Sequence, residues 1–233
     1  MTDDFEGFKC VGGFSSPPCL AGEVAPDYFD PLAVDPQQAR DVARWRVAER
    51  NRLLNERKAM RSQNKQYVAK ALTTHLTELL AEQRSTATVK IVSLFWPIKD
   101  EPDLRLLMHD LHGQGWQIAL PVVVRKAGPL VFREWCPTTR MTRGRWNIPV
   151  PSASEPELHP QIVIAPLVGW DAEGYRLGYG GGYFDRTLGA TLPKPLSIGV
   201  GFSSARVSTI FPQPHDIPLD AIITEAGREF ERE

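Results

Sequence analysis

The feature that most constrains the fold is a glycine-rich stretch, residues 178–182, which lies between an apolar run and the expected start of a helix. The apolar run Gln161–Pro166 has the length and the β-branched content of a buried strand. From Tyr183 onward the pattern indicates a helix, with Asp185 in its first turn. A strand, a glycine turn and a helix N-terminus together direct unpaired N–H groups and the helix dipole at one space. This arrangement predicts an anion site, and phosphate is the anion that we expect there.

Apolar runs alternate with helical patterns along most of the chain, which is typical of an α/β fold. Helices are expected at 37–60, 62–83 and 102–113, and the second and third show apolar residues spaced three or four apart. Strands that alternate with helices favour a largely parallel sheet with helices on both faces, which binds ligands beyond the carboxyl ends of its strands. Strands are expected at 89–96, 117–124, 130–135, 161–166, 196–202 and 221–224.

The 233 residues suffice for one α/β domain with an appended arm. Residues 1–36 are rich in Gly, Pro, Ser and Asp and show no periodic pattern, so we expect a loop-like arm there. Residues 37–233 are expected to form a single α/β domain. Within this domain, residues 138–157 are rich in Pro and Arg and fit a flap or pocket wall better than an element of the sheet.

Charge and composition argue against several classes of partner and location. The net charge of −1 gives no overall field that recruits nucleic acid or an anionic membrane. No stretch approaches the roughly 20 apolar residues that span a bilayer, and no signal peptide is expected at the start of the chain. Three cysteines without a metal-ligand pattern favour a reducing, cytoplasmic location, and a disulfide between Cys10 and Cys19 is the alternative.

Residues 44–65, which run from the first expected helix into the start of the second, contain eight basic residues and two glutamates. Most of these basic side chains fit a solvated surface, and a basic helix alone is weak evidence for nucleic-acid binding. Arg46 and Arg50 are four residues apart and therefore share one helix face. The alternative is that this face reaches the phosphate site, because the planar guanidinium of arginine matches phosphate oxygens.

The glycine-rich stretch matches neither of the two common nucleotide-binding fingerprints. A Walker A loop continues with Lys and then Ser or Thr, whereas Tyr and Phe follow Gly182. A dinucleotide fingerprint requires glycine three residues after Gly180, where Tyr183 stands. Four glycines in five positions also fit a tight turn that binds nothing. Phosphate is favoured by Arg176, a cation, and by Asp185, which is either a carboxylate for Mg²⁺ or only a helix N-terminal charge.

Loop residues elsewhere in the chain suggest a heterocycle site, whereas nucleophilic catalysis has little support. No Gly-x-Ser-x-Gly turn occurs, and Cys136 has no histidine near it in sequence. Trp96 ends an expected strand, and Glu101 and Trp146 stand in expected loops. At such positions rings can stack on a flat heterocycle and a carboxylate can accept from its N–H groups. Two packing tryptophans and a helix N-terminal glutamate are the simpler alternative.

The run Arg176-Leu-Gly-Tyr-Gly-Gly-Gly-Tyr-Phe-Asp-Arg resembles the glycine motif of the 5-formyltetrahydrofolate cyclo-ligases, also called methenyltetrahydrofolate synthetases. Weaker matches fall in the same order from about residue 46 to residue 225, at Asp100-Glu101, 146–151, Pro166 and 215–225. The resemblance implies a three-layer α/β/α sandwich with a mostly parallel sheet. That fold is related to those of ribose-5-phosphate isomerase and coenzyme A transferase.

The same resemblance implies roles for individual residues. The positions implied for ATP are Arg46, Arg50, Arg176, Leu177, Gly178, Tyr179, Gly180, Gly181, Gly182, Tyr183 and Phe184. The positions implied for a reduced folate are Trp96, Glu101, Trp146, Tyr179 and Tyr183. Arg176 and Asp185 are the implied catalytic residues, and Mg²⁺ would be bound by Asp185, with Asp216 as a second candidate ligand.

The implied activity is an ATP-dependent ring closure. In that family, ATP phosphorylates the formyl oxygen of 5-formyltetrahydrofolate, the neighbouring nitrogen attacks, and 5,10-methenyltetrahydrofolate, ADP and phosphate leave. Such a reaction requires positioning and charge stabilisation rather than a protein nucleophile. The implied partners are these small molecules, without nucleic acid or membrane, and the chain is expected to be a monomer or a homodimer.

Three positions depart from the pattern of the family. Arg46 replaces a lysine, Phe184 replaces a tyrosine, and Ala205 stands where glutamine is usual. These departures leave two alternatives open. One is a paralogue that binds ATP but acts on another small molecule, and the other is a non-catalytic nucleic-acid-associated module that uses the basic helix.

Overall fold

The computed structural model describes residues 35–84 and 91–232. The predicted arm, apart from its last two residues, lies outside the described residues, and so do the first two residues of the strand predicted at 89–96. The chain divides into two compact units, residues 1–39 and 40–233, and the site residues discussed below belong to the second.

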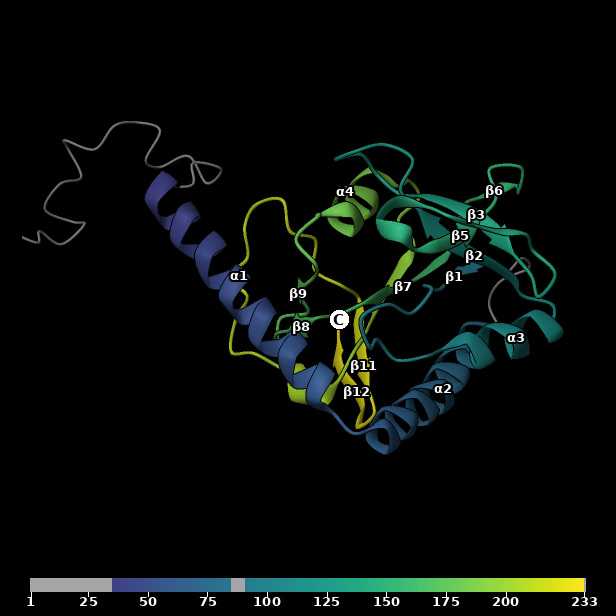
Figure 1. Cartoon of the computed structure of the whole chain (residues 1–233), viewed down its shortest axis with the longest axis horizontal. Coiled ribbons are helices and arrows are strands. Elements are labelled where there is room, and N and C mark those ends of the chain that lie inside the picture. The colour runs from purple at the N-terminus through teal and green to yellow at the C-terminus, as the bar shows by residue number, and fades with distance from the viewer. Residues whose placement is uncertain (1–34, 85–90, 233) are drawn as a thin grey trace, which may run out of the picture. The chain divides into compact units, whose positions relative to one another are not determined.

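The helices occupy the predicted ranges to within one residue, except that α3 (Arg105–Gly113) begins three residues later than predicted. The helix α2 illustrates the cause, because its leucines and valine recur every three or four residues and are buried as a stripe against the sheet. In Figure 1, α2 and α3 lie on one side of the sheet and α4 lies on the other. The described α-helices are α1 (Pro36–Ala59), α2 (Ser62–Arg84), α3 (Arg105–Gly113) and α4 (Tyr183–Ala190).

All six predicted strands are present in one eight-stranded sheet, each shorter than or equal to its expected range. The five inner strands run parallel in the order β11-β10-β7-β1-β2, and β12, β3 and β6 are antiparallel additions at the two edges. The mostly parallel α/β fold is therefore confirmed. The main-sheet strands are β1 (Ile91–Ser93), β2 (Gln117–Val122), β3 (Val131–Trp135), β6 (Glu157–Leu158), β7 (Ile162–Pro166), β10 (Leu196–Val200), β11 (Ala221–Thr224) and β12 (Gly227–Glu231).

Two small sheets stand apart from the main one and carry loop segments of interest. The segment expected to be a flap forms the hairpin of β4 (Met141–Arg143) and β5 (Pro149–Pro151), with a 3₁₀ turn at Arg145–Asn147 between the strands. The second pair, β8 (Gly169–Trp170) and β9 (Arg176–Leu177), leads from the end of β7 into the glycine-rich stretch. Both pairs thus position loops rather than extend the main sheet.

The strand order reverses between β1 and β7, and this reversal positions the site. The chain passes from β1 to β2 on one side, whereas β7 lies on the other side of β1 and continues to β10 and β11. In open parallel sheets, the crevice at such a switch point, beyond the carboxyl ends of the two strands, is where ligands bind. The loop that follows β1 and the β8–β9 segment with its glycine-rich stretch both begin there.

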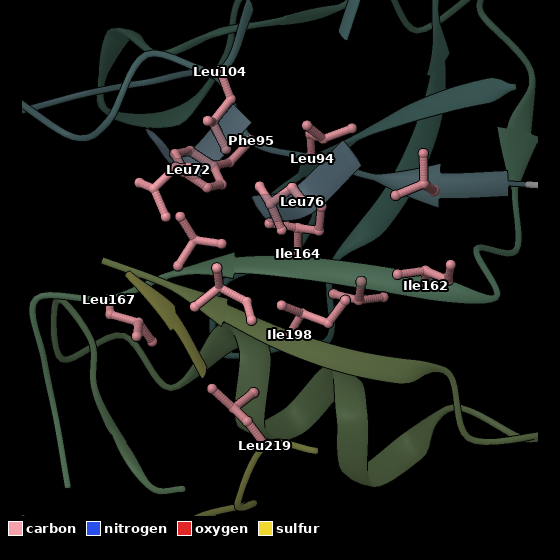
Figure 2. Packing of buried hydrophobic residues seen from close by; sticks show 14 of the residues in the cluster. Leu72, Leu76, Leu94, Phe95, Leu104, Ile162, Ile164, Leu167, Ile198 and Leu219 are labelled. Carbon is pink, nitrogen blue, oxygen red and sulfur yellow. The ribbon is translucent and has the colours of Figure 1, made fainter. Parts of the chain in front are cut away.

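The hydrophobic core fills the space between the helices and the sheet. Figure 2 shows Leu76 of α2 beside Leu94 and Ile164, and Leu72 of α2 beside Phe95; all five side chains are buried. Burying one such side chain contributes about 1.5–3 kcal/mol, so this layer fixes the position of α2. Among the described residues, no helix combines the length and the apolar character needed to cross a membrane.

Candidate active site

The glycine-rich stretch adopts a backbone that other residues would strain. Gly180 and Gly182 have φ angles of +92° and +60°, in the left-handed region that glycine tolerates best. A Cβ on Gly181 would lie 2.7 Å from the ring of Tyr183. The helix α4 begins at Tyr183, as predicted, and Gly182 is its N-cap residue. The glycines are thus required for the chain to turn from β9 into α4.

A pocket of about 480 Å³ lies against this turn. This volume is within the range of small-molecule sites, and the N-terminus of α4 and the glycine backbone form part of the wall. Unpaired N–H groups of a helix start make such a wall suitable for phosphate oxygens. The lining residues are Gly180, Gly181, Gly182, Asp185, Arg186, Gly189, Ala190, His215 and Ile217.

The buried Arg176 and the partly buried Asp185 form an ion pair beside the pocket. Arg176 Nη2 donates to Asp185 Oδ1 at 2.6 Å, and Arg176 Nη1 donates to the carbonyl of Ile217 at 2.8 Å. The backbone N–H of Ile217 also donates to Asp185 Oδ1, at 3.2 Å. Burial lowers the pKa of Arg176, and the carboxylates of Asp185 and Asp216 oppose this effect. Among the described residues, Asp185 Oδ1 accepts both of these hydrogen bonds and Oδ2 accepts none, and Asp185 lines the pocket.

Two arginines of α1 reach the same region, as the phosphate interpretation of the basic helix requires. Arg50 Nε donates to the carbonyl of Gly178 at 2.6 Å, and its guanidinium lies against Gly180. Arg46 pairs with Asp216 at 2.5 Å and also donates to the carbonyls of residues 210 and 211. Burial and the Arg46 cation lower the pKa of Arg50. Arg50 therefore offers its η nitrogens toward the glycine turn, whereas Arg46 is engaged by a carboxylate.

The carboxylates fit a magnesium ion that arrives with phosphates better than one held by protein ligands alone. Among the described residues, no group of three or more His, Cys, Asp or Glu side chains forms a metal cluster. Mg²⁺ commonly takes one or two carboxylates together with substrate phosphates and water. Asp185 has a free oxygen on the pocket wall, whereas both oxygens of Asp216 accept from Arg46. Asp185 is thus suited to bind Mg²⁺, whereas Asp216 could bind it only after its ion pair with Arg46 is broken.

Glu101 and Tyr179 meet at the switch point between β1 and β7. Tyr179 Oη donates to Glu101 Oε1 at 2.9 Å, and the backbone N–H of Ile98 donates to Glu101 Oε2 at 2.8 Å. Lys99 lies over the ring of Tyr179 at 5.1 Å from its centroid. Glu101 is only 8% exposed, and burial raises its pKa to about 7 despite the two hydrogen bonds and the charges of Arg57 and Lys99. The hydrogen bond thus holds a titratable carboxylate against Tyr179, the residue that directly precedes Gly180 of the pocket wall.

The raised pKa of Glu101 predicts a pH-dependent loss of stability. The folded pKa of about 7 exceeds the ordinary value of 4.5. The stability that the protonated carboxyl contributes is therefore fully present below about pH 4.5 and is lost as pH rises through 7. Glu101→Gln lacks this titration. Between pH 4.5 and pH 8, the wild type should lose about 3 kcal/mol of unfolding free energy that the variant does not lose. Urea unfolding at both pH values measures it, and Glu173→Gln, an exposed control, should show no such gain.

The flap presents an aromatic pair beside the start of α4. The rings of Trp146 and Tyr183 contact each other edge to face at 5.7 Å. Arg145 lies over Trp146 and Arg186 lies over Tyr183, at 5.7 and 5.1 Å from the ring centroids. Trp146 is 64% exposed and has a φ of +55°, which is costly for a bulky residue. An exposed ring held in a strained backbone is suited to contact a ligand rather than to pack the core.

The structure brings most of the predicted residues together, but in two groups. The pocket wall, the ion pair and the arginines form one group, and Glu101 with Tyr179 forms the other. Trp96 follows β1, yet its ring packs on the core and under Arg105, at 5.5 Å, and no described ring contact joins it to the glycine stretch. The assignment of Trp96 to the ligand stays a prediction. Leu177 is buried in β9 and Phe184 packs against the core, so both can act through their backbone.

The sequence pattern and the resemblance assign no ligand role to three residues of the site. Arg186 and His215 line the pocket, and Arg57 donates to Tyr179. Arg186 follows Asp185 in the first turn of α4, where a cation beside a phosphate site is a recognisable position. His215 directly precedes Asp216. Arg57 is one of eight basic residues of the same segment, and nothing in the sequence separates it from its exposed neighbours.

Comparisons with known proteins agree with this geometry. A model of the 5-formyltetrahydrofolate cyclo-ligase family matches residues 42–225. The chain is 32% identical over 139 residues to the 5-formyltetrahydrofolate cyclo-ligase of Escherichia coli K12, covering 57% of this chain and 76% of that protein. It is 29% identical over 159 residues to the enzyme of the same name from Haemophilus influenzae, covering 66% and 83%. The solution structure of 5,10-methenyltetrahydrofolate synthetase from Aquifex aeolicus superposes with a TM-score of 0.69 at 26% identity, covering 81% of this chain and 93% of that one.

Proposed function

The chain belongs to the 5-formyltetrahydrofolate cyclo-ligase family, and we propose that it converts 5-formyltetrahydrofolate and ATP to 5,10-methenyltetrahydrofolate, ADP and phosphate. One observation carries the proposal furthest. The peptide 176–183 borders both a pocket that suits phosphates and, through Tyr179, a buried carboxylate that suits the N–H groups of a heterocycle. A reaction that transfers a phosphoryl group from a nucleotide to a folate requires such a shared wall.

The chemistry requires activation of a poor leaving group. The formyl oxygen attacks the γ-phosphorus of ATP and ADP leaves. The neighbouring secondary amine of the folate then attacks the formyl carbon and loses its proton. The carbon–oxygen bond breaks, so that the former formyl oxygen departs in the phosphate. No protein nucleophile takes part, and the protein contributes positioning and charge stabilisation.

The residues of the site divide this work. The backbone of Gly180–Gly182 and the start of α4 bind the phosphates, with the Arg50 guanidinium beside them. Arg176 holds Asp185 in place by its ion pair. Mg²⁺, bound with the nucleotide and held by Asp185, would neutralise charge on the phosphate oxygens. Asp216 serves as a second ligand only if it is released from Arg46.

The folate is recognised by the second group of residues. Glu101 accepts hydrogen bonds from the N–H groups of the pterin ring, and the exposed ring of Trp146 covers the ligand from the flap. The proposal extends to a single catalytic domain over residues 37–233, to a cytoplasmic location, and to a monomer or homodimer without a nucleic-acid partner.

Arg50→Ala is expected to weaken ATP binding about tenfold while folate binding is retained, because a charge-assisted contact to phosphate is worth about 1.5–3 kcal/mol. Isothermal titration with ATP and with 5-formyltetrahydrofolate measures the two affinities separately. Arg44→Ala, at an exposed arginine of the same helix, is the matched control and should leave both unchanged. If Arg50→Ala binds ATP as tightly as wild type, Arg50 does not contact the phosphates.

The proposed function is tested by incubating the purified full chain with 5-formyltetrahydrofolate and Mg-ATP and following the absorbance of the methenyl product. We expect turnover that requires both substrates. ATP binding without turnover would overturn the proposal in favour of a paralogue with another small-molecule substrate. RNA binding that weakens with salt, without ATP binding, would favour the nucleic-acid-associated module.

A further inference from the structure

Arg57 of α1 is a buried cation rather than part of the solvated basic face. It is 3% exposed, and its guanidinium lies over the ring of Phe202 at 5.1 Å from the centroid. Arg57 Nη2 donates to the carbonyl of Leu167, and Arg57 Nη1 donates to Tyr179 Oη at 3.4 Å. The side chain therefore connects α1 to the loop after β7 and to the residue that holds Glu101.

A gain in folding stability does not account for the burial of Arg57. No carboxylate forms an ion pair with Arg57 within residues 35–84 and 91–232, and its buried Nε has no hydrogen-bond partner there. A buried charge without a direct counter-ion costs free energy, and an apolar residue of similar size would usually be more stable. The nearest carboxylate along the hydrogen bonds is Glu101, with only the Tyr179 hydroxyl between them.

The direction of the hydrogen bonds gives Arg57 a specific effect. A guanidinium has donors but no acceptor, so the Tyr179 oxygen must accept from Arg57. The single proton of the hydroxyl is then directed to Glu101 Oε1, while the backbone N–H of Ile98 donates to Oε2. When Glu101 is ionised, both of its oxygens act as acceptors, and their remaining lone pairs can accept only from a ligand that donates.

We propose that Arg57 is a positioning residue which, through the Tyr179 hydroxyl, holds Glu101 as a hydrogen-bond acceptor for the N–H groups of the substrate. This inference rests on the proposed function for the identity of the substrate. In this role Arg57 makes the site favour a heterocycle edge with hydrogen-bond donors over an edge with acceptors. Arg57 touches no substrate itself in this role.

Other charged groups near Glu101 set the background for the test. Tyr179 faces Glu101 from the glycine-rich stretch, Arg57 from α1, and Lys99 from the loop after β1. Asp100, the preceding residue, is paired with Lys65 of α2 at 2.9 Å, so its charge is compensated. Arg57 is the member of this set that acts through the shared hydroxyl, and a variant at Arg57 leaves the others in place.

Two substitutions separate positioning from packing. Arg57→Lys keeps a cation with donors only, whereas Arg57→Gln is neutral and offers an acceptor that lets the Tyr179 proton turn away from Glu101. Both lose the guanidinium fork. For Arg57→Gln we expect kcat/KM for the folate to fall about tenfold near pH 7 and to recover near pH 9. For Arg57→Lys we expect a profile within about twofold of wild type, and for the exposed control Arg61→Gln no change.

A measurement on the protein without substrate makes the outcome independent of the proposed function. The carboxyl carbon of Glu101, in protein labelled with ¹³C-glutamate and assigned by its loss in Glu101→Gln, should titrate at higher pH in Arg57→Gln than in wild type or Arg57→Lys. Equal losses of kcat/KM at every pH in both Arg57 variants, or an unmoved Glu101 titration, would overturn the inference. A wild-type protein that shows the expected titrations but no folate turnover would instead overturn the proposed function.

Discussion

Asp185→Asn is expected to lower kcat by at least about 100-fold, which corresponds to about 2.7 kcal/mol of transition-state stabilisation. The physical reason is the position of Asp185 on the pocket wall, with Oδ2 free and Oδ1 held by Arg176 and by the N–H of Ile217. Asparagine keeps an acceptor for both donors but loses the negative charge that would hold Mg²⁺. The concentration of Mg²⁺ needed for half-maximal turnover should therefore rise as well.

The same substitution leaves Arg176 buried without its counter-ion, so stability must be separated from catalysis. Asp220→Asn is the matched control, because Asp220 is another partly buried carboxylate that accepts two hydrogen bonds, from the N–H and the hydroxyl of Ser197. We expect Asp220→Asn to lower the unfolding free energy while kcat is retained. Turnover and Mg²⁺ dependence of Asp185→Asn that equal those of wild type would contradict the role of Asp185.

Glu101→Gln is expected to lower kcat/KM for the folate by about 100-fold at pH 8, where the carboxyl of the wild type is ionised. A carboxylate accepts from two N–H groups of the ring, whereas the amide of glutamine presents one acceptor and one donor, so that one contact becomes repulsive. The KM for ATP should stay within about twofold of wild type, since Glu101 lies outside the group that lines the phosphate pocket.

The control for this prediction is Asp103→Asn, two residues along the same loop. Asp103 is exposed and pairs with Arg105, so its loss should leave both KM values unchanged. Steady-state kinetics with each substrate varied in turn distinguish the outcomes. Equal losses for ATP and folate in Glu101→Gln would indicate a general disturbance of the site, and an unchanged folate KM would remove Glu101 from recognition.

The elements of the fold could be predicted because their signals are local. The three-four spacing of the leucines of α2 and the apolar run at 161–166 each lie within one element, and the structure places both where the pattern does. The start of α4 was equally readable, because glycines and a first-turn carboxylate mark a helix N-terminus. Strand order was not readable, since the pairing of β1 with both β2 and β7 joins segments far apart in the chain.

The charges of the site could be identified in type but not in partnership. The resemblance implies a ligand role for both Arg46 and Asp216, yet they lie 170 residues apart in sequence and pair with each other in space. Arg57 shows the same limit, because its burial depends on Leu167, Tyr179 and Phe202, which no spacing rule connects to α1. Residue types predict a phosphate and heterocycle site, and only tertiary packing decides which cations remain free.

The most direct test of the account follows the formyl oxygen. Wild-type protein is incubated with Mg-ATP and 5-formyltetrahydrofolate that carries ¹⁸O in the formyl group, and the released phosphate is analysed by mass spectrometry. We predict one ¹⁸O atom in the phosphate and equal amounts of ADP and methenyl product, because the activated oxygen leaves with the γ-phosphoryl group. Phosphate without ¹⁸O, or ADP formed without methenyl product, would contradict the account.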